Sequence, residues 1–225
     1  MIQIKKPAHE QKVLFSNKKQ IEVTTEELKT IQNSKCCYCE TAVQGEIEHY
    51  FPKSKYKWLV GSWQNLFYVC SYCNRKKSNT FDICGTKANE TDDCRTCFDK
   101  EKPCFVNPEL DDSPEKMFSF NDKCEIEAID SNNCEIGKSR MNYTIEKLDL
   151  NNKFLVEQRL LVIKHLKTAV LAFVSSGKTK TEIEVLNFII KIFIKPLKDK
   201  KENHIAFRKF IVKNCLENIL NESLK

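Results

Sequence analysis

The stretch Cys36-Cys37-Tyr38-Cys39, followed by Glu48-His49, Asn65-Leu66 and Cys70-Ser71-Tyr72-Cys73-Asn74, decides the fold. Its two Cys-x-x-Cys pairs, Cys36/Cys39 and Cys70/Cys73, have the spacing of a tetrahedral zinc site in which thiolates fill every position. Such a closed site holds structure and performs no chemistry. We expect zinc here, with unligated core thiols as the alternative, since free cysteine is often buried. Cys37 is a rival ligand at a less usual spacing.

The composition bounds the class of protein. At 225 residues with 41% hydrophobic residues, the chain can bury a core of its own. It has 12 cysteines, yet residues 1–30 show no apolar signal-peptide core. The most apolar run, residues 188–194, is interrupted by Lys191, whereas a membrane helix needs about twenty apolar residues. We expect a cytoplasmic protein with no membrane span, in which paired cysteines bind metal before they form disulfides.

The net charge of +6 is unevenly distributed. Residues 153–225 carry 15 basic against 7 acidic side chains, and residues 90–135 carry 14 acidic against 5 basic. Residues 53–77 hold six basic side chains, Lys53, Arg75 and Lys77 among them, and no acidic one. This segment suits a surface that faces phosphates, and an ordinary solvated face is the alternative.

Local patterns predict the elements around the cysteine pairs. Thr24-Thr25-Glu26-Glu27 has the form of a capping box that starts a helix ending near Asn33. A strand is expected around residues 47–51, and a helix near Cys73, so that the unit reads strand, strand, helix. Residues 118–120 and 126–129 predict a small hairpin around an Asn121-Asp122 turn. Apolar spacing then predicts three helices: one ending near Gly177, one ended by Pro196, and a third from Ile205 to Leu220.

The expected fold class is α+β and mainly helical, with a zinc-stabilised strand-strand-helix unit. We divide the chain into a lead-in with a short helix at 1–35, the zinc-stabilised unit at 36–83, an acidic cysteine-rich insert at 84–138 and a helical region at 139–225. Within the insert, Cys84, Cys94, Cys97 and Cys104 are candidates for a second four-thiolate zinc site. Dispersed thiols in a loop-rich segment are the alternative.

His49 lies between the two cysteine pairs and is the candidate general base. A neutral imidazole is the side chain best suited to take a proton from water near pH 7. Hydrolysis of a phosphodiester also needs a cation to neutralise charge, and Mg²⁺ prefers oxygen ligands. Glu48 and Asn74 offer such oxygens. Alone, a histidine or an asparagine would more often be structural, and only the full series raises these residues above that reading.

The assembled series resembles the HNH endonuclease superfamily of the cysteine-knuckle type, whose ββα-metal unit is marked by Cys-x-x-Cys, an acidic residue before histidine, Asn-Leu, and Cys-x-x-Cys-(His/Asn)-x-x-Lys. The resemblance implies that His49 activates water, that Asn65 holds the His49 loop, and that Glu48 with Asn74 binds a catalytic Mg²⁺ or Mn²⁺. Lys77 would then lie near phosphate. Glu48 departs from the commoner Asp, which places its carboxylate one methylene farther from the backbone.

A wider set of residues is similar to a narrower branch of that superfamily, the PtuB nucleases of Septu and some retron antiphage systems. The set comprises Glu48-His49-Tyr50-Phe51-Pro52-Lys53, Asn107-Pro108 with Asp112 and Glu115, Thr144-Ile145 with Leu148, Leu150 and Asn151, and Arg159. This resemblance implies an antiviral defence nuclease that acts with an ABC-type ATPase, PtuA, which restrains it until infection.

Three readings of the function stay open. The preferred one is hydrolysis of DNA. The same centre could cut RNA such as a tRNA, because the base and the ion act on the phosphate and need not read the sugar. A third reading is a non-catalytic, zinc-dependent binding module that docks residues 53–77 on nucleic acid and the acidic insert on a protein. A further hypothesis is that segment 90–135 shields a basic active-site face.

Overall fold

The computed structural model describes residues 1, 3–8, 12–129, 139–176, 181–195 and 204–214. It folds as two compact units, of which the first comprises Met1–Ser119 and Ile126–Asn151, and the second Phe120–Glu125 and Asn152–Lys225. The first unit takes in the predicted lead-in, the predicted zinc-stabilised unit and much of the cysteine-rich insert. The α+β class expected from the sequence is confirmed.

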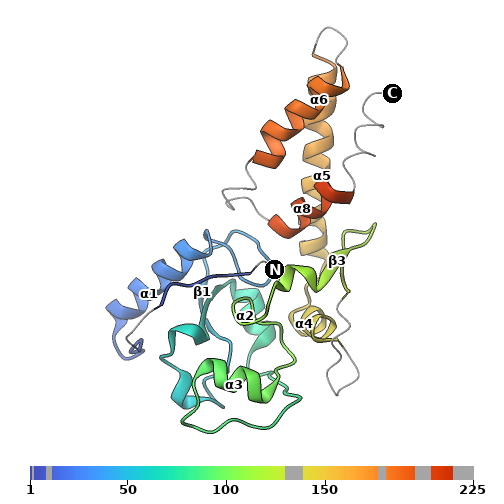
Figure 1. Ribbon diagram of the computed structural model, residues 1–225. Coiled ribbons are helices and arrows are strands. Elements are labelled where there is room, and N and C mark those ends of the chain that lie inside the picture. The colour runs from blue at the N-terminus through green and yellow to red at the C-terminus, as the bar shows by residue number, and fades with distance from the viewer. Residues whose placement is uncertain (2, 9–11, 130–138, 177–180, 196–203, 215–225) are drawn as a thin grey trace. The chain divides into compact units, whose positions relative to one another are not determined.

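An antiparallel strand pair followed by a helix lies at the centre of the first unit (Figure 1). Strand β1 (Glu46–His49) pairs with β2 (Leu66–Val69) in a register that places His49 opposite Leu66. Helix α2 (Ser71–Lys77) follows directly. Two short 3₁₀ turns, η1 (Lys57–Leu59) and η2 (Trp63–Asn65), lie between the strands. The expected order of strand, strand and helix is therefore present.

Helix α1 (Lys18–Ile31) starts earlier than the sequence predicted. Its N-cap is Asn17, whose side chain accepts a hydrogen bond from the backbone N–H of Gln20 at 3.1 Å. Thr24 and Thr25 lie inside the helix, where the Thr25 hydroxyl donates to the carbonyl of Ile21. The capping-box pattern at Thr24 was thus the wrong start. The helix buries Leu28 in a core cluster, whose other buried members are Val13, Trp63, Leu66 and Tyr68.

The acidic insert packs into the first unit with several of its carboxylates buried. It contributes α3 (Cys94–Glu101) and the 3₁₀ turn η3 (Pro114–Lys116). Glu101 is fully buried and accepts from the Tyr56 hydroxyl at 2.5 Å. Glu109 pairs with buried Lys6 at 2.9 Å. Glu101 accepts a hydrogen bond and Glu109 pairs with a lysine inside the protein. The surface of the insert is therefore less acidic than its count of acidic residues suggests.

The segments after the insert agree with the sequence where they are described. Strands β3 (Phe118–Phe120) and β4 (Ile126–Ala128) form the predicted hairpin. Helix α4 (Arg140–Leu148) follows at the start of the region predicted to be helical, although it was not predicted as a separate helix. The long α5 (Lys153–Val174) ends just before the predicted Gly177. Pro196 and the end of the third predicted helix lie outside the described residues.

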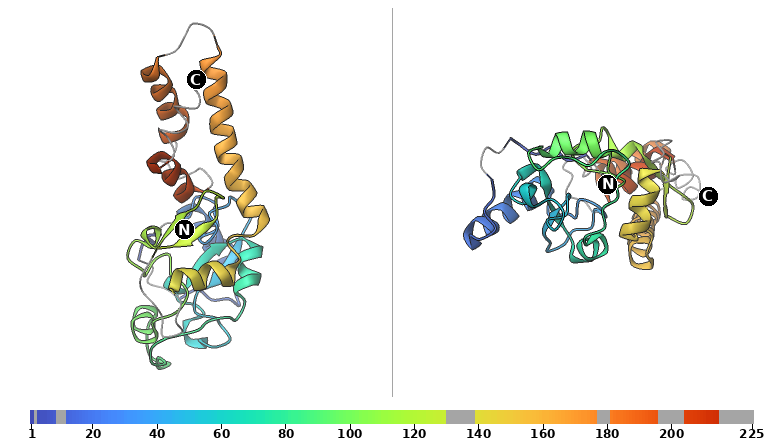
Figure 2. Two further views of the ribbon diagram at one scale, coloured as in Figure 1. Left: turned by 90° about the vertical axis from the view of Figure 1, so that its right-hand side faces the viewer. Right: turned by 90° about the horizontal axis from the view of Figure 1, so that it is seen from below.

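In the second unit, α6 (Glu182–Ile189) runs alongside α5 (Figure 2), and the rings of Phe173 and Phe188 stack at 4.3 Å. A π-helical turn, η4 (Ile190–Ile194), continues α6, and α8 (Ile205–Asn214) is the last described helix. Among the described residues, no helix is both long enough and apolar enough to cross a membrane.

Candidate metal centre and active site

The four cysteines of the two pairs converge on one point. The Sγ atoms of Cys36, Cys39, Cys70 and Cys73 all lie within 4.8 Å of one another, and those of Cys39 and Cys70 are 3.8 Å apart. A zinc tetrathiolate with Zn–S bonds of about 2.3 Å separates its sulfurs by about 3.8 Å. The donor set and its spacing therefore fit a structural zinc ion.

Local backbone geometry prepares both halves of this centre. The first pair lies on a tight turn closed by the Lys35–Ala42 bridge, in which the Glu40 N–H donates to the carbonyl of Cys36 at 3.0 Å. The second pair begins α2, where the Cys70 sulfur caps the helix by accepting from the Cys73 N–H at 3.3 Å. A bound ion would join the turn before β1 to the first turn of α2.

Burial and hydrogen bonding among the four thiols shift their pKa values in opposite directions. A hydrogen bond with Cys36 lowers the pKa of Cys39 to about 7, and the same neighbour lowers the pKa of Cys70. Burial raises the pKa of Cys36. A metal ion binds thiolates and would complete the deprotonation of the set.

The structure does not gather the second set of cysteines. Cys84 and Cys104 lie together, with their sulfurs 3.3 Å apart, but the thiol of Cys94 donates to the Ser62 hydroxyl at 3.2 Å and that of Cys97 faces the Asp92 carbonyl. Within the described ranges, the one cysteine group compact enough for a shared ion is the first. The second zinc site is not assembled in this structure, because α3 aims its two thiols at different partners.

His49, at the end of β1, is held as a neutral imidazole. Its Nε2 lies 3.0 Å from the carbonyl oxygen of Val60. A carbonyl only accepts, so Nε2 carries the proton and Nδ1 keeps a free lone pair. Burial lowers the pKa of His49 to about 4, and the nearby ammonium groups of Lys53 and Lys77 act in the same direction. At neutral pH the ring is therefore available as a proton acceptor through Nδ1.

Asn65 is fully buried and holds the segment that follows His49. Its Oδ1 accepts from the N–H of Phe51 at 2.7 Å, and its Nδ2 donates to the carbonyls of Phe51 and Leu59, both at 3.1 Å. Its backbone carbonyl accepts from the N–H of Tyr50 at 2.9 Å. One side chain thus fixes both ends of the 51–59 loop.

Glu48 and Lys77 face inward. Glu48 is 3% exposed; its Oε2 accepts from the Tyr38 hydroxyl at 3.1 Å, and its Oε1 forms an ion pair with Lys77. Both oxygens are engaged, so in this arrangement the carboxylate does not fit a ligand of a hydrated Mg²⁺ ion, whereas Asn74 lies half-buried on α2. The Lys77 ammonium is fully buried, and the expected direct contact with phosphate is not available to it.

Exposed basic side chains near this centre include Lys53, after β1, and Arg75, on α2. Lys76 is half-exposed and pairs with Asp149 at 3.1 Å, and the Tyr72 hydroxyl donates to the same carboxylate at 2.5 Å. The sequence reading missed Tyr38 and Asp149. The sequence around Tyr38 does not indicate that its hydroxyl binds Glu48. Asp149 is more than 70 residues from Tyr72 and Lys76 in the sequence, so no local pattern predicts its contacts with them.

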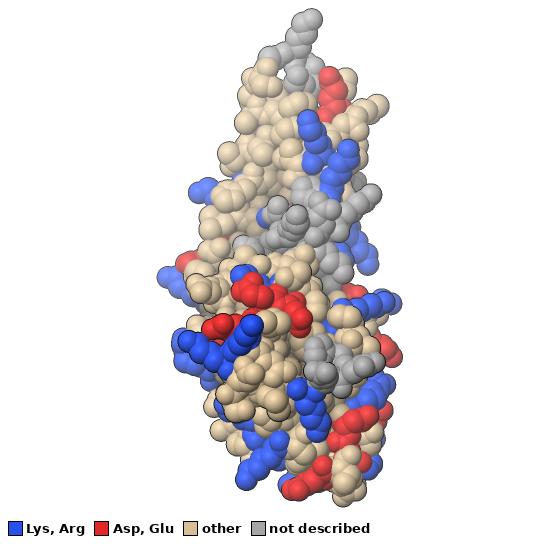
Figure 3. All heavy atoms as spheres, turned by 90° about the vertical axis from the view of Figure 1, so that its left-hand side faces the viewer, with Lys and Arg blue, Asp and Glu red and all other residues tan. Residues whose placement is uncertain are grey.

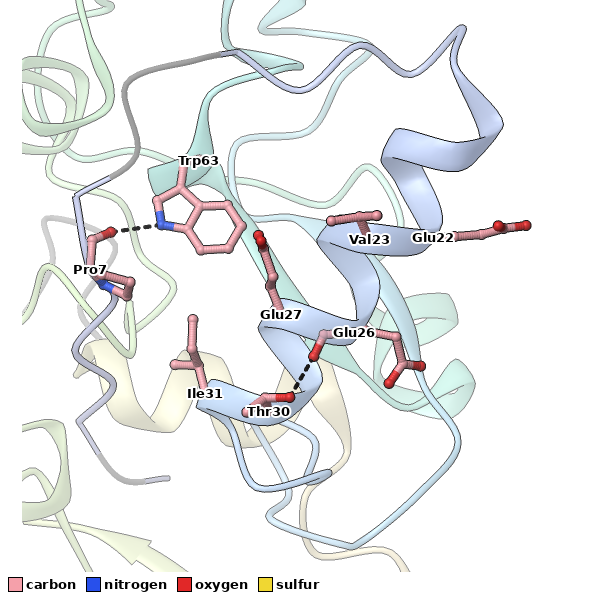
Figure 4. Close-up of a pocket in the computed structure, with 8 residues that line it drawn as sticks. All are labelled: Pro7, Glu22, Val23, Glu26, Glu27, Thr30, Ile31 and Trp63. Atoms are coloured by element: carbon pink, nitrogen blue, oxygen red, sulfur yellow. Dashed lines mark hydrogen bonds between the residues drawn. The ribbon is translucent and has the colours of Figure 1, made fainter.

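A separate hollow of about 670 Å³ lies along α1. Figure 4 shows its apolar wall of Val23, Ile31 and Trp63, with the Trp63 indole donating to the carbonyl of Pro7 at 3.0 Å. The face shown in Figure 3 carries acidic and basic side chains close together. None of the predicted catalytic or metal-binding residues lines this hollow.

Comparison with known proteins gives three similar chains. Septu protein PtuB of Bacillus mycoides strain KBAB4 is 30% identical over 160 residues, which is 62% of this chain and 50% of that protein. Septu protein PtuB of Bacillus thuringiensis is 32% identical over 96 residues, covering 40% of this chain and 30% of the relative. Septu protein PtuA of Bacillus mycoides is 29% identical over 151 residues, covering 60% of this chain and 20% of the relative.

The chain thus spans half or less of the length of the curated relatives it matches. No protein-family model and no solved structure matches it. The comparisons show a similarity to Septu PtuB, and what such a protein does comes to this chain only as a proposal.

The first prediction concerns zinc. The purified chain should contain about one zinc ion, and Cys73→Ser should lose it and unfold, because structural zinc sites supply folding free energy directly. Metal content and thermal unfolding measure this. Cys37→Ser is the matched control, since Cys37 is a buried neighbour outside the cluster. If Cys37→Ser loses zinc and Cys73→Ser keeps it, then Cys37 is the zinc ligand and Cys73 is not.

The second prediction concerns Asn65. Asn65→Ala should lower the free energy of unfolding by about 2 to 4 kcal/mol, because it removes three side-chain hydrogen bonds and leaves buried backbone groups unpaired. Urea unfolding of the zinc-loaded protein measures the change. Gln64→Ala, on an exposed neighbour, should stay within about 0.5 kcal/mol of wild type. Equal effects of the two substitutions would contradict the assignment.

The third prediction concerns pH. His49 titrates near 6.5 when unfolded and near 4 when folded, so the unfolded state binds its proton first. Its contribution to stability is present above about pH 6.5 and is lost as the pH falls towards 4. Wild type should lose about 3 kcal/mol more than His49→Gln over that range. Urea unfolding at several pH values measures the difference, and parallel curves would contradict the folded pKa.

Proposed function

We propose that this protein is a metal-dependent endonuclease that hydrolyses phosphodiester bonds of DNA, as the effector of an antiphage defence system. The observation that carries the proposal is the neutral imidazole of His49 at the end of β1, in a strand-strand-helix unit that a four-cysteine centre closes. The similarity to Septu PtuB supports the placement in defence.

The proposed reaction uses His49 as the general base. Nδ1 takes a proton from a water molecule, and the water oxygen bonds to phosphorus. The bond from phosphorus to the 3′-oxygen breaks with its electron pair on that oxygen, which takes a proton from solvent, so that the products carry a 3′-hydroxyl and a 5′-phosphate. Lys53 lies between β1 and β2 in the sequence and Arg75 lies on α2; both are exposed cations, and we propose that they bind the nucleic-acid backbone. Asn65 keeps the loop after His49 in place during the reaction.

The sequence predicts Mg²⁺ or Mn²⁺ at Glu48 and Asn74. Divalent cations neutralise charge on the phosphate in this class of reaction. Glu48 is engaged with Lys77 and Tyr38, so no step of the reaction is assigned to the ion.

We further propose a partner of the PtuA kind, an ABC-type ATPase. The support is indirect: the similar proteins include both a PtuB and a PtuA of the same Bacillus mycoides strain, and the part of PtuA that matches is a fifth of its length. The notion that the insert shields the active site receives little support, because Glu101 and Glu109 are engaged internally.

The test is cleavage of labelled double-stranded DNA, single-stranded DNA and tRNA by zinc-loaded wild type, His49→Ala and His165→Ala. His165 is an exposed histidine of α5 and serves as the matched control. Chelating resin should clear the buffer of Mg²⁺ before it is added back, because a soluble chelator would also strip zinc. Each variant is assayed alone and with a co-expressed ATPase.

Wild type and His165→Ala should cut DNA only with added Mg²⁺ or Mn²⁺, and His49→Ala should be slower by about 10²-fold or more. Cleavage of tRNA alone would replace DNA by RNA as the substrate. If no protein cuts under any condition, while wild type and His49→Ala bind nucleic acid equally, the proposal is overturned in favour of a binding module.

A further inference from the structure

We propose that Glu48 and Lys77 are positioning residues for His49, and that neither side chain binds the substrate or its cation. The inference rests on the proposed function for the role of His49. It departs from the metal and phosphate contacts that the sequence resemblance implies, and it starts from how the two side chains are satisfied.

The Lys77 ammonium bridges two adjacent residues of β1. It forms an ion pair with the Glu48 carboxylate and donates to the backbone carbonyl of His49 at 2.9 Å. Three rings surround the remaining side of the ammonium: those of Tyr50, Phe81 and Phe105 have centroids 6.0, 5.9 and 5.8 Å from Nζ. Lys77 is fully buried and therefore has no exposed N–H for a phosphate.

The strand geometry explains why the side chains of Glu48 and His49 have different partners. Successive side chains of a strand point to opposite faces. Glu48 is directed to the α2 side, where Lys77 and Tyr38 bind it, so His49 is directed to the other side, towards Phe15 and the Val60 carbonyl. A carboxylate on the inner face is poorly placed to share an ion with a base on the outer face.

The last residue of α2 thus fixes the backbone of the catalytic histidine. Cys70 and Cys73 of the four-cysteine centre lie at the first turn of α2, and Lys77 ties its final turn to β1. Removing one partner of a buried ion pair leaves an uncompensated charge, which costs far more than removing both. This asymmetry gives the test.

The variants are Glu48→Gln, Lys77→Met and the double variant, with Glu46→Gln and Lys76→Met as matched controls on the same strand and helix. Glu46 and Lys76 are exposed or half-exposed. Urea unfolding of the zinc-loaded proteins gives the unfolding equilibrium constant, and Mn²⁺ binding by electron paramagnetic resonance gives a readout that does not depend on cleavage.

We expect each single variant to raise the unfolding constant about 100-fold or more, the double variant to lie closer to wild type, and the controls to stay within about 3-fold. Mn²⁺ affinity should be the same in wild type and Glu48→Gln. Cleavage by Glu48→Gln should fall in kcat, with the Mg²⁺ concentration for half-maximal rate unchanged. If a single variant does not fold, the double variant takes its place in the Mn²⁺ measurement.

Two results would overturn the inference. One is a pair of single variants as stable as the controls, which would show that the buried pair does not form. The other is a folded Glu48→Gln or double variant that loses Mn²⁺ binding or needs at least tenfold more Mg²⁺, which would make Glu48 a ligand. A wild type that binds no Mn²⁺ agrees with the inference. If the wild-type protein does not cut nucleic acid, the proposed function is wrong. The unfolding constants of the single and double variants then still decide whether Glu48 and Lys77 form the buried pair.

Discussion

The four-cysteine centre is the constraint on which the rest of the first unit depends. Strands β1 and β2 contain four residues each, and an isolated two-stranded pair is at best marginally stable in water. A zinc ion held by both cysteine pairs would tie the turn before β1 to the first turn of α2. Once α2 is fixed at its start, its end delivers Lys77 to the backbone of β1, and the imidazole of His49 is set on the opposite face. The proposed role of His49 as a base therefore depends on contacts that begin at the four cysteines.

Buried charge pairs extend the same arrangement through the first unit. Lys6 lies between the backbone carbonyls of Trp63 and Leu66 and pairs with Glu109, so the first residues of the chain are bonded to the insert. Arg140 pairs with Asp111 and donates to the carbonyls of Pro103 and Phe105, so α4 is bonded to it as well. Each of these charges is neutralised where it is buried, and breaking one partner would leave the other uncompensated. Lys53 and Arg75 are exposed cations outside these pairs, and they are the ones proposed to bind a phosphate backbone.

Much of this could be predicted from the sequence, and the exceptions have a common cause. Cysteine spacing located the four-cysteine cluster, and apolar periodicity located α5, because both signals are local. Asn107, Thr144 and Asn151, which marked the resemblance to one nuclease branch, turn out to bond the backbone: the Thr144 hydroxyl accepts from Val106, and Asn151 bonds both the N–H and the carbonyl of Ile126. The start of α1 was misplaced because Asn17 and Thr24 both suit a cap. The second zinc site and the roles of Glu48 and Lys77 depend on which way side chains point after folding, which spacing along the chain does not encode.

The tautomer of His49 in the zinc-loaded protein at neutral pH tests the central claim most directly. A long-range ¹H–¹⁵N correlation spectrum, assigned with His49→Gln, distinguishes the two ring nitrogens. The account predicts a neutral ring with the proton on Nε2, donated to the Val60 carbonyl, and a bare Nδ1 ready to accept a proton from water. An imidazolium, or a neutral ring with its proton on Nδ1, would contradict the assignment of His49 as the base in this geometry.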